Sequence, residues 1–211
     1  MKSLLIIGAG PFGRELINWI SKIPDFAQDY VIKGFLDNRE NIINQDLSNY
    51  KVIGDPFNYK FEDIDICLMG VADTEYKSLL YNHLKNKVKF MTFISPDAYV
   101  SPSSKIGTGS VICPNVSISN DTKIGRFVTI NVGAKIGHDC DIKKYTSIMT
   151  DAKLGGDVII KQKAYIGIGA IIISNLHVGE SSFVGAGSVV INDISEKNTV
   201  FGNPAKRIKS N

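Results

Sequence analysis

The chain carries two different hydrophobic periods, and the change between them comes near residue 93. Before it, short apolar runs alternate with stretches in which apolar residues recur every three or four positions. This alternation predicts a parallel sheet with helices packed on it. The expected strands cover 4–8, 30–37, 65–70 and 88–94, and the expected helices cover 12–23 and 74–86.

After Phe93 an aliphatic residue recurs at every sixth position. From Ile94 to Val190 each position of this column is Ile, Leu or Val. A second column, four residues after the first, is mostly small, and glycine often follows the aliphatic residue. A period of six sustained for about 100 residues fits neither a helix nor a hairpin sheet, and it predicts a parallel β-helix. We expect the aliphatic column to stack inside and the glycines to permit the turn dihedrals at the corners.

Composition excludes several classes of function. The net charge is +3 over 211 residues, too mild for a nucleic-acid-binding protein, and no basic stripe with interleaved aromatics is present. Three cysteines without CxxC or Cys/His spacing argue against a disulfide framework and against a metal site. No apolar run is long enough to span a bilayer, and a glycine motif interrupts the apolar N-terminal segment. We therefore expect a cytoplasmic protein without membrane insertion.

A glycine loop, "GAGPFG", follows the first predicted strand and opens the first predicted helix. Its Gly8, Gly10 and Gly13 form a GxGxxG motif, and N–H groups at a helix start can hold a phosphate. Asp37 ends the second strand, where an acidic residue can bond a ribose hydroxyl. Only about half of a dinucleotide-binding fold precedes the repeats, which favours one nucleotide over NAD. Two alternatives stay open: NAD binding, and glycines that only pack the strand against the helix.

His138 is the candidate catalytic side chain in the repeats. It lies two positions after Ile136 and outside both inward columns, so we expect it at an exposed corner. An imidazole can take up a proton near neutral pH. Asp139 could accept a hydrogen bond from the other ring nitrogen, provided that the corner turns both side chains the same way. The other histidines, His83 and His177, are weaker candidates, near a helix end and on an outward face.

The chain as a whole resembles the hexapeptide-repeat nucleotide-sugar N-acetyltransferases of bacteria, in the subgroup with the sialic-acid O-acetyltransferase-like proteins. The resemblance rests on the repeats, the glycine loop, the stretch Gly137-His138-Asp139 and the closing "VFGNPAKRI". It implies a left-handed β-helix, against the usual right-handed crossover. The implied organisation is an α/β half-Rossmann domain over 1–93 that binds the nucleotide-sugar, followed by an all-β left-handed parallel β-helix over 94–211 with the acyltransferase site and a C-terminal tail.

The resemblance also implies a role for each matching residue. His138 would be the general base, with Asp139 beside it, and Gly156 would lie at the thioester oxygen. Asn131 would hold the sugar or order His138. The residues that would contact the nucleotide-sugar are Gly10, Pro11, Phe12, Asp37, Asn38 and Gly70, and those that would line the pantetheine channel of acetyl-CoA are Ser147, Gly156, Ile168 and Ala186.

Three functions remain in competition at this stage. The first is acetyl-CoA-dependent N-acetylation of a nucleotide-linked (UDP or dTDP/GDP) 4-amino sugar for surface glycan biosynthesis. The second is O-acetylation of a sugar or of sialic acid, because the repeats and His138 serve both reactions. The third is a non-catalytic β-helix scaffold.

The position of His138 also predicts the oligomeric state. An outward His138 needs a second protein surface beside it to form a water-poor cleft. Three copies in cyclic closure would supply that surface, so we expect a homotrimer.

Overall fold

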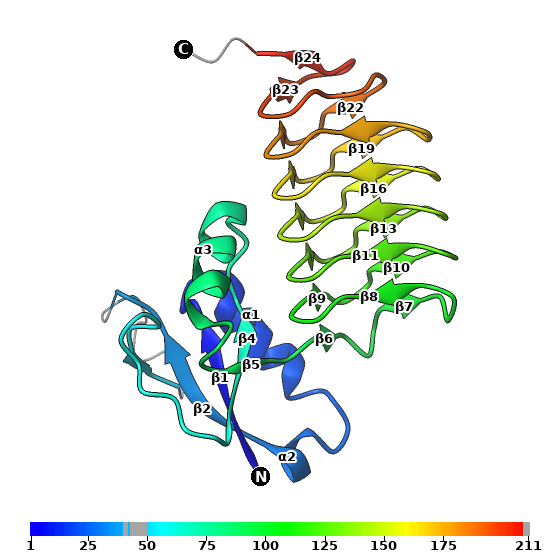
Figure 1. Ribbon diagram of the computed structural model, residues 1–211. Coiled ribbons are helices and arrows are strands. Elements are labelled where there is room, and N and C mark those ends of the chain that lie inside the picture. Colours follow the sequence, from blue (N-terminus) through cyan, green and yellow to red (C-terminus); the bar gives the residue numbers. More distant parts are fainter. Residues whose placement is uncertain (40–41, 43–49, 209–211) are drawn as a thin grey trace. The chain divides into compact units, whose positions relative to one another are not determined.

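The computed structural model describes residues 1–39, 42 and 50–208, which form two compact units (Figure 1). The first unit, Met1–Pro96, is a parallel sheet with helices. The second unit, Asp97–Asn211, is a parallel β-solenoid whose coils stack one on another.

The first unit contains a five-stranded sheet in the order β3-β2-β1-β4-β5, with every pair parallel. The elements are β1 (Lys2–Ile7), α1 (Pro11–Ile20), α2 (Phe26–Asp29), β2 (Tyr30–Leu36), β3 (Val52–Gly54), β4 (Asp65–Met69), α3 (Thr74–Leu84), β5 (Lys89–Phe90) and β6 (Phe93–Ile94). The single strand expected over 88–94 is wrong, because it is divided into β5 and β6. The pattern did not predict β3 or α2. Among the described residues, no helix is both long and apolar enough to cross a bilayer.

The strand order of this unit reverses between β1 and β4. From β1 the chain runs through α1 to β2 on one side, and from β4 it runs through α3 to β5 on the other. Parallel sheets bind ligands beyond the carboxyl ends of the strands at such a reversal. Gly70, just after β4, lies here because a Cβ on it would be 2.9 Å from the Ile7 carbonyl oxygen and 3.0 Å from the Gly13 Cα. The ends of β1 and β4 are therefore the place where a ligand of this sheet is expected.

Most strands of the solenoid have two residues and pair in parallel with the strand 18 residues later, as Ile118 pairs with Ile136. The last two strands differ, because Thr199–Phe201 has three residues and pairs antiparallel with Lys206–Arg207. One coil thus holds three six-residue repeats. Its strands are β7 (Tyr99–Val100), β8 (Lys105–Ile106), β9 (Val111–Ile112), β10 (Ser117–Ile118), β11 (Lys123–Ile124), β12 (Thr129–Ile130), β13 (Lys135–Ile136), β14 (Asp141–Ile142), β15 (Ser147–Ile148), β16 (Lys153–Leu154), β17 (Ile159–Ile160), β18 (Tyr165–Ile166), β19 (Ile171–Ile172), β20 (His177–Val178), β21 (Phe183–Val184), β22 (Val189–Val190), β23 (Thr199–Phe201) and β24 (Lys206–Arg207).

These strands form three sheets, and the chain turns a corner after each strand. The sheets contain β22-β19-β16-β13-β10-β7, then β20-β17-β14-β11-β8, and then β24-β23-β21-β18-β15-β12-β9. Stacked corners make three long edges. We call the corners after β10, β13, β16 and β19 the histidine edge, those after β11, β14 and β17 the basic edge, and those after β12, β15, β18 and β21 the third edge.

The aliphatic column forms the solenoid core over most of its length. Every member from Ile112 to Val190 is buried. The prediction is wrong at its first position, because Ile94 is 41% exposed and the neighbouring Phe93 is buried in its place. Val100 and Ile106 are half-buried. The period therefore identifies the core but not where the core begins.

The glycines after the aliphatic column have a different role from the expected one. They do not adopt positive φ. A Cβ on Gly137 would lie 2.5 Å from the carbonyl carbon of Gly155 in the next coil, so the corner lacks space for any side chain. The left-handed dihedrals come two residues later, for example at Asp121 (φ 59°) and Asp139 (φ 57°), and Asp tolerates this conformation better than most residues do.

Polar members of the small column bond neighbouring coils together. The Ser110 hydroxyl donates to the Gly125 carbonyl and the Thr122 hydroxyl to the Gly137 carbonyl, each at 2.8 Å. The Cys140 thiol donates to the Gly155 carbonyl at 3.2 Å. Cys67, Cys113 and Cys140 are all buried and none of them forms a disulfide, in keeping with a structural use of the thiols.

Candidate active site

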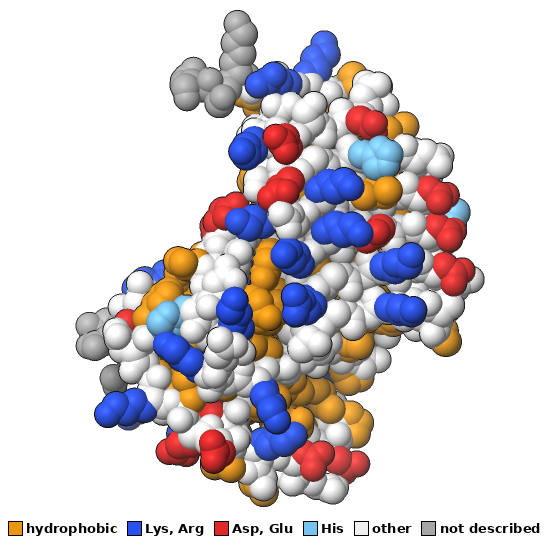
Figure 2. All heavy atoms as spheres, viewed as in Figure 1, with side chains coloured by type: hydrophobic (Ala, Val, Ile, Leu, Met, Phe, Trp, Pro, Cys, Tyr) orange, Lys and Arg blue, Asp and Glu red, His pale blue; other side chains and the backbone are white. Residues whose placement is uncertain are grey.

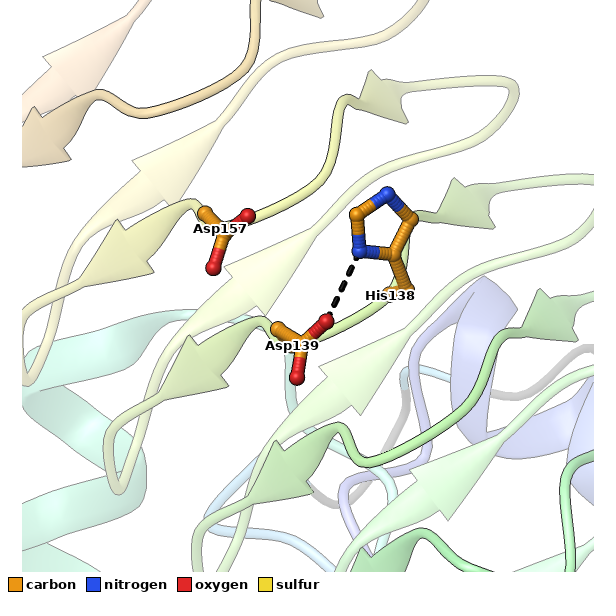
Figure 3. A group of neighbouring side chains, drawn as sticks. All are labelled: His138, Asp139 and Asp157. Carbon is orange, nitrogen blue, oxygen red and sulfur yellow. Dashed lines mark hydrogen bonds and ion pairs between the residues drawn. The ribbon is translucent and has the colours of Figure 1, made fainter.

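His138 leaves β13 at the histidine edge and projects an imidazole that is 63% exposed. Its Nδ1 lies 2.8 Å from Oδ2 of Asp139 (Figure 3). The left-handed backbone of Asp139 permits this contact between adjacent residues, which an extended strand would point to opposite faces. A neutral ring that donates from Nδ1 keeps Nε2 as its acceptor. The hydrogen bond expected from the sequence is present, and the catalytic role stays a prediction.

The ring of His138 lies over Gly156 in the next coil. A methyl group on Gly156 would be 2.5 Å from Nε2 and 3.0 Å from Nδ1, so the ring occupies the space of the missing side chain. This contact brings a peptide unit beside Nε2, the nitrogen that would accept the proton. The Gly156 N–H, however, donates to the Ser174 hydroxyl at 3.1 Å. The expected oxyanion donor therefore already has an acceptor one coil further on.

Asp157 joins His138 and Asp139 at the same edge (Figure 3). The ligand atoms of the three side chains lie within 4.8 Å of one another, and the Asp157 N–H donates to the His138 carbonyl at 2.9 Å. Within the described ranges, these three exposed residues are the group that could hold a metal ion. Asp157 was not predicted from the sequence, although it lies 18 residues, one coil, after Asp139.

Other residues that the resemblance implies lie away from His138. Asn131, Ile168 and Ala186 follow β12, β18 and β21, which places them on the third edge. Ile168 is 55% exposed, while the Asn131 side chain is nearly buried and accepts the Val132 N–H at 2.7 Å. Ser147, in β15, is fully buried. A single chain therefore does not bring Asn131, Ile168 and Ala186 to the imidazole.

A cavity of about 410 Å³ lies at the strand reversal of the first unit. Four of the residues predicted to contact a nucleotide-sugar line it: Gly10, Asp37, Asn38 and Gly70. Pro11 and Phe12 are not among the lining residues, and the Phe12 ring packs against Trp19 with centroids 6.3 Å apart. Other lining residues, which come from loops after the strands and from α3, were not predicted from the sequence: Arg39, Pro56, Val71, Asp73 and Tyr76.

Asp37 is the buried carboxylate of this cavity. It accepts the Ala9 N–H at 2.9 Å and two guanidinium hydrogen bonds from Arg39, at 2.9 and 3.0 Å. Burial alone would raise the pKa of Asp37, but the hydrogen bonds from Arg39 and Ala9 together lower this pKa below its ordinary value. The carboxylate is therefore charged at neutral pH and fixes both the glycine loop and the guanidinium at the cavity.

The basic edge carries a second hollow, of about 550 Å³, on the solenoid. Figure 2 shows Lys and Arg side chains gathered over the middle coils. The cations that line the hollow are Lys123, Arg126, Lys143, Lys144 and Lys161. Lys143 pairs with Asp141 at 2.6 Å, and acidic Glu180 also lines the hollow. Charge compensation of this kind is typical of a solvated surface.

The remaining histidines have local partners. Nε2 of His83 lies 3.0 Å from the Phe57 carbonyl oxygen in the first unit. His177 leaves its Nδ1 3.5 Å from Oδ2 of Asp193, and its strand, β20, belongs to a different sheet from β13. Of the three histidines, only His138 lies against a glycine peptide of the next coil.

Comparisons with known proteins place this geometry in context. No protein-family profile and no curated protein sequence matches the chain. Solved structures match it along its whole length. PerB from Caulobacter crescentus, in complex with CoA and GDP-perosamine, is 25% identical with a TM-score of 0.87, and the match covers 99% of this chain and 98% of PerB.

Two further structures match equally fully. The acetyltransferase domain of PglB from Neisseria gonorrhoeae, in complex with acetyl coenzyme A, is 29% identical with a TM-score of 0.84 and coverage of 98% and 99%. WeeI from Acinetobacter baumannii is 27% identical with a TM-score of 0.87 and coverage of 99% and 100%. The solenoid matches a left-handed β-helix. Over its whole length, the chain is therefore similar to solved hexapeptide-repeat, left-handed β-helix N-acetyltransferases.

Proposed function

We propose that the chain transfers an acetyl group from acetyl-CoA to the amino group of a nucleotide-linked amino sugar for surface glycan biosynthesis. The observation that carries the proposal is His138, with Nδ1 held by Asp139 and the ring seated on the Gly156 peptide. Similar proteins support both substrates, since one was solved with CoA and GDP-perosamine and another with acetyl coenzyme A. The cytoplasmic location expected from the sequence stays a prediction.

The proposed reaction needs one proton acceptor and one oxyanion donor. The amine nitrogen attacks the thioester carbonyl carbon, and its proton passes to Nε2 of His138 as the C–N bond forms. Negative charge builds on the thioester oxygen, where N–H or O–H donors lower the barrier. The C–S bond then breaks, and the imidazolium returns the proton to the CoA sulfur. Asp139 stabilises the imidazolium through its hydrogen bond to Nδ1.

We propose that the first unit is half of a dinucleotide-binding fold and that its cavity holds the nucleotide of the acceptor. Gly10 supports this, because no atom lies within 4 Å of where its Cβ would be, whereas Gly13 and Gly70 are needed for packing. Pro11 has no N–H, so a phosphate at the start of α1 would be met by the N–H groups of Phe12 and Gly13. The contribution of Phe12 would then come from its backbone.

Binding measurements test this cavity. By calorimetry, a GDP-, UDP- or dTDP-linked amino sugar should bind, and NAD should not. Asp37→Asn should weaken that binding by about 10- to 100-fold, because it removes a charged hydrogen-bonding group that also orients Arg39. Tight NAD binding, or wild-type affinity in Asp37→Asn, would contradict the assignment.

We propose that the complete site forms between copies in a homotrimer. His138 and Gly156 lie on the histidine edge, whereas Asn131, Ile168 and Ala186 lie on the third edge. A second copy that sets its third edge beside the first copy's histidine edge would unite them, and cyclic closure with three copies would make three such sites. The exposed Ile168 would then be covered. Sedimentation equilibrium should give a trimer, and a fully active monomer at micromolar concentration would contradict this arrangement.

Release of free CoA thiol tests the function as a whole. The purified protein should release thiol from acetyl-CoA in the presence of at least one nucleotide-linked 4-amino sugar. The matching sugar with a hydroxyl in place of the amine separates N-acetylation from O-acetylation. If neither the amino sugars nor the matching hydroxyl sugars stimulate thiol release, the result contradicts the proposed function and favours the scaffold hypothesis.

A further inference from the structure

Ser174 occupies the histidine edge two coils beyond His138. It follows β19 at the corner position that His138 has after β13 and Gly156 has after β16. Strands in neighbouring coils lie about 4.8 Å apart, so His138 and Ser174 are the neighbours of the Gly156 peptide along the edge. Ser174 is exposed. Its side chain therefore reaches the surface where the thioester would lie.

The Ser174 hydroxyl lies against both glycines of the Gly155-Gly156 pair. Its Oγ accepts the Gly156 N–H at 3.1 Å. A Cβ on Gly155 would lie 2.5 Å from the same Oγ and 2.7 Å from the Ser174 nitrogen. The absence of a side chain at Gly155 thus leaves room for this hydroxyl, and the hydroxyl covers the N–H that the resemblance assigns to the oxyanion.

A hydroxyl that accepts one hydrogen bond still has its own proton to donate. Among the described residues, the proton of the Ser174 hydroxyl meets no acceptor, and Ser174 is an exposed residue. Acceptance of the Gly156 N–H polarises the O–H bond and strengthens it as a donor. The Gly156 N–H thus donates to Ser174 Oγ, and the Ser174 O–H is in turn available to donate to a substrate.

We propose that Ser174 is a catalytic residue whose hydroxyl donates to the thioester oxygen. The inference rests on the proposed acetyl transfer. As the amine nitrogen bonds to the carbonyl carbon, the carbonyl π electrons move to oxygen, and the Ser174 O–H stabilises that charge without giving up its proton. When the C–S bond breaks, the electrons return and the hydrogen bond weakens. Gly156 acts through Ser174 and positions its hydroxyl.

A purely structural role for the hydroxyl is the competing explanation, and the chain contains a matched control for it. Ser103 lies at the corner after β7, one coil before the first corner of the histidine edge, where its Oγ accepts the Asp121 N–H at 2.9 Å. This contact also joins residues 18 apart and also involves an exposed serine. Ser103→Ala therefore removes a similar bond between coils at a position two coils before Asp139.

Steady-state kinetics on Ser174→Ala, Ser174→Thr and Ser103→Ala test the proposal. Ser174→Ala should lower kcat by about 10- to 100-fold with little change in the KM for acetyl-CoA. This loss lies at or below the lower end of the usual oxyanion-hole range of about 10²–10³, because the Gly156 N–H, once released from Ser174, can replace part of the lost donor. Ser174→Thr, which keeps the hydroxyl, should retain most of kcat. Ser103→Ala should be as active as wild type.

Several results would overturn the proposal. For Ser174→Ala, these are a kcat that is within twofold of wild type or higher, or a change confined to the KM for acetyl-CoA. For the other variants, they are a loss of kcat in Ser103→Ala equal to that in Ser174→Ala, or a kcat in Ser174→Thr as low as that in Ser174→Ala. Thermal unfolding of all three variants shows whether each is folded. A wild-type protein that is inactive on every acceptor would instead refute the proposed function, so the two failures are distinguishable.

Discussion

Replacement of His138 by alanine should lower kcat by about 10²–10⁴, the usual cost of losing a general base. The KM for acetyl-CoA should change little, because the ring acts mainly as the amine loses its proton. Folding and assembly should be almost unaffected, since the ring is 63% exposed and no core contact is lost. Asp139→Asn should cost less, because Asp139 orients the ring and does not take the proton. Initial rates of CoA thiol release at saturating substrate measure both effects.

His177→Ala is the control for this prediction. Its ring is 54% exposed and also pairs with an aspartate, Asp193, but it lies on another sheet of the solenoid. We expect wild-type kcat from this variant. If His138→Ala keeps more than about a tenth of wild-type kcat, His138 is not the essential base, and the amine must lose its proton to another group.

A pair of alanine substitutions at adjacent glycines should separate catalysis from folding. In Gly156→Ala the new methyl group takes the space of the His138 ring, which can swing outward because it is exposed. We expect a normal fold and a loss in kcat of about 10²-fold, since misplacement by about 1 Å can cost that much. In Gly155→Ala the methyl group meets the Ser174 backbone nitrogen at 2.7 Å, and the backbone cannot move aside as freely.

Gly155→Ala should therefore destabilise the solenoid by about 1–3 kcal/mol, as overpacking does elsewhere. Denaturant unfolding and kcat, measured on both variants, give the comparison. Wild-type activity in Gly156→Ala would show that the ring position is not needed. Equal loss of stability in the two variants would show that the contact with His138 is as rigid as the backbone contact.

The six-residue period predicted the solenoid because one aliphatic residue per repeat must point inward in every coil. It could not show where the core begins, since Ile94 fits the spacing and Phe93 fills the space. It also suggested the wrong role for the glycines that follow the aliphatic column, which were expected to permit the turn dihedrals. The sequence pattern shows where the glycines are but not why they are needed. In the structure, a Cβ on Gly137 would collide with the backbone of the next coil, and Gly137 does not adopt a positive φ.

The site followed from the sequence in part. His138 and Gly156 could be paired because they lie one coil apart at the same corner. Ser174 and Asp157 obey the same 18-residue spacing and were overlooked, although the spacing alone does not show that the Ser174 hydroxyl bonds the Gly156 N–H. Arg39 in the first unit could not be predicted from its position, because its role depends on folding back onto Asp37.

The most direct test of acetyl transfer to an amino sugar is the mass and linkage of the product. Purified protein is incubated with acetyl-CoA and nucleotide-linked 4-amino sugars, and the products are analysed by mass spectrometry and NMR, with His138→Ala in parallel. We expect one nucleotide-sugar to gain a single acetyl group in amide linkage, with the product nearly absent in the variant. An ester-linked product, equal product from His138→Ala, or no acetylated nucleotide-sugar at all would contradict it.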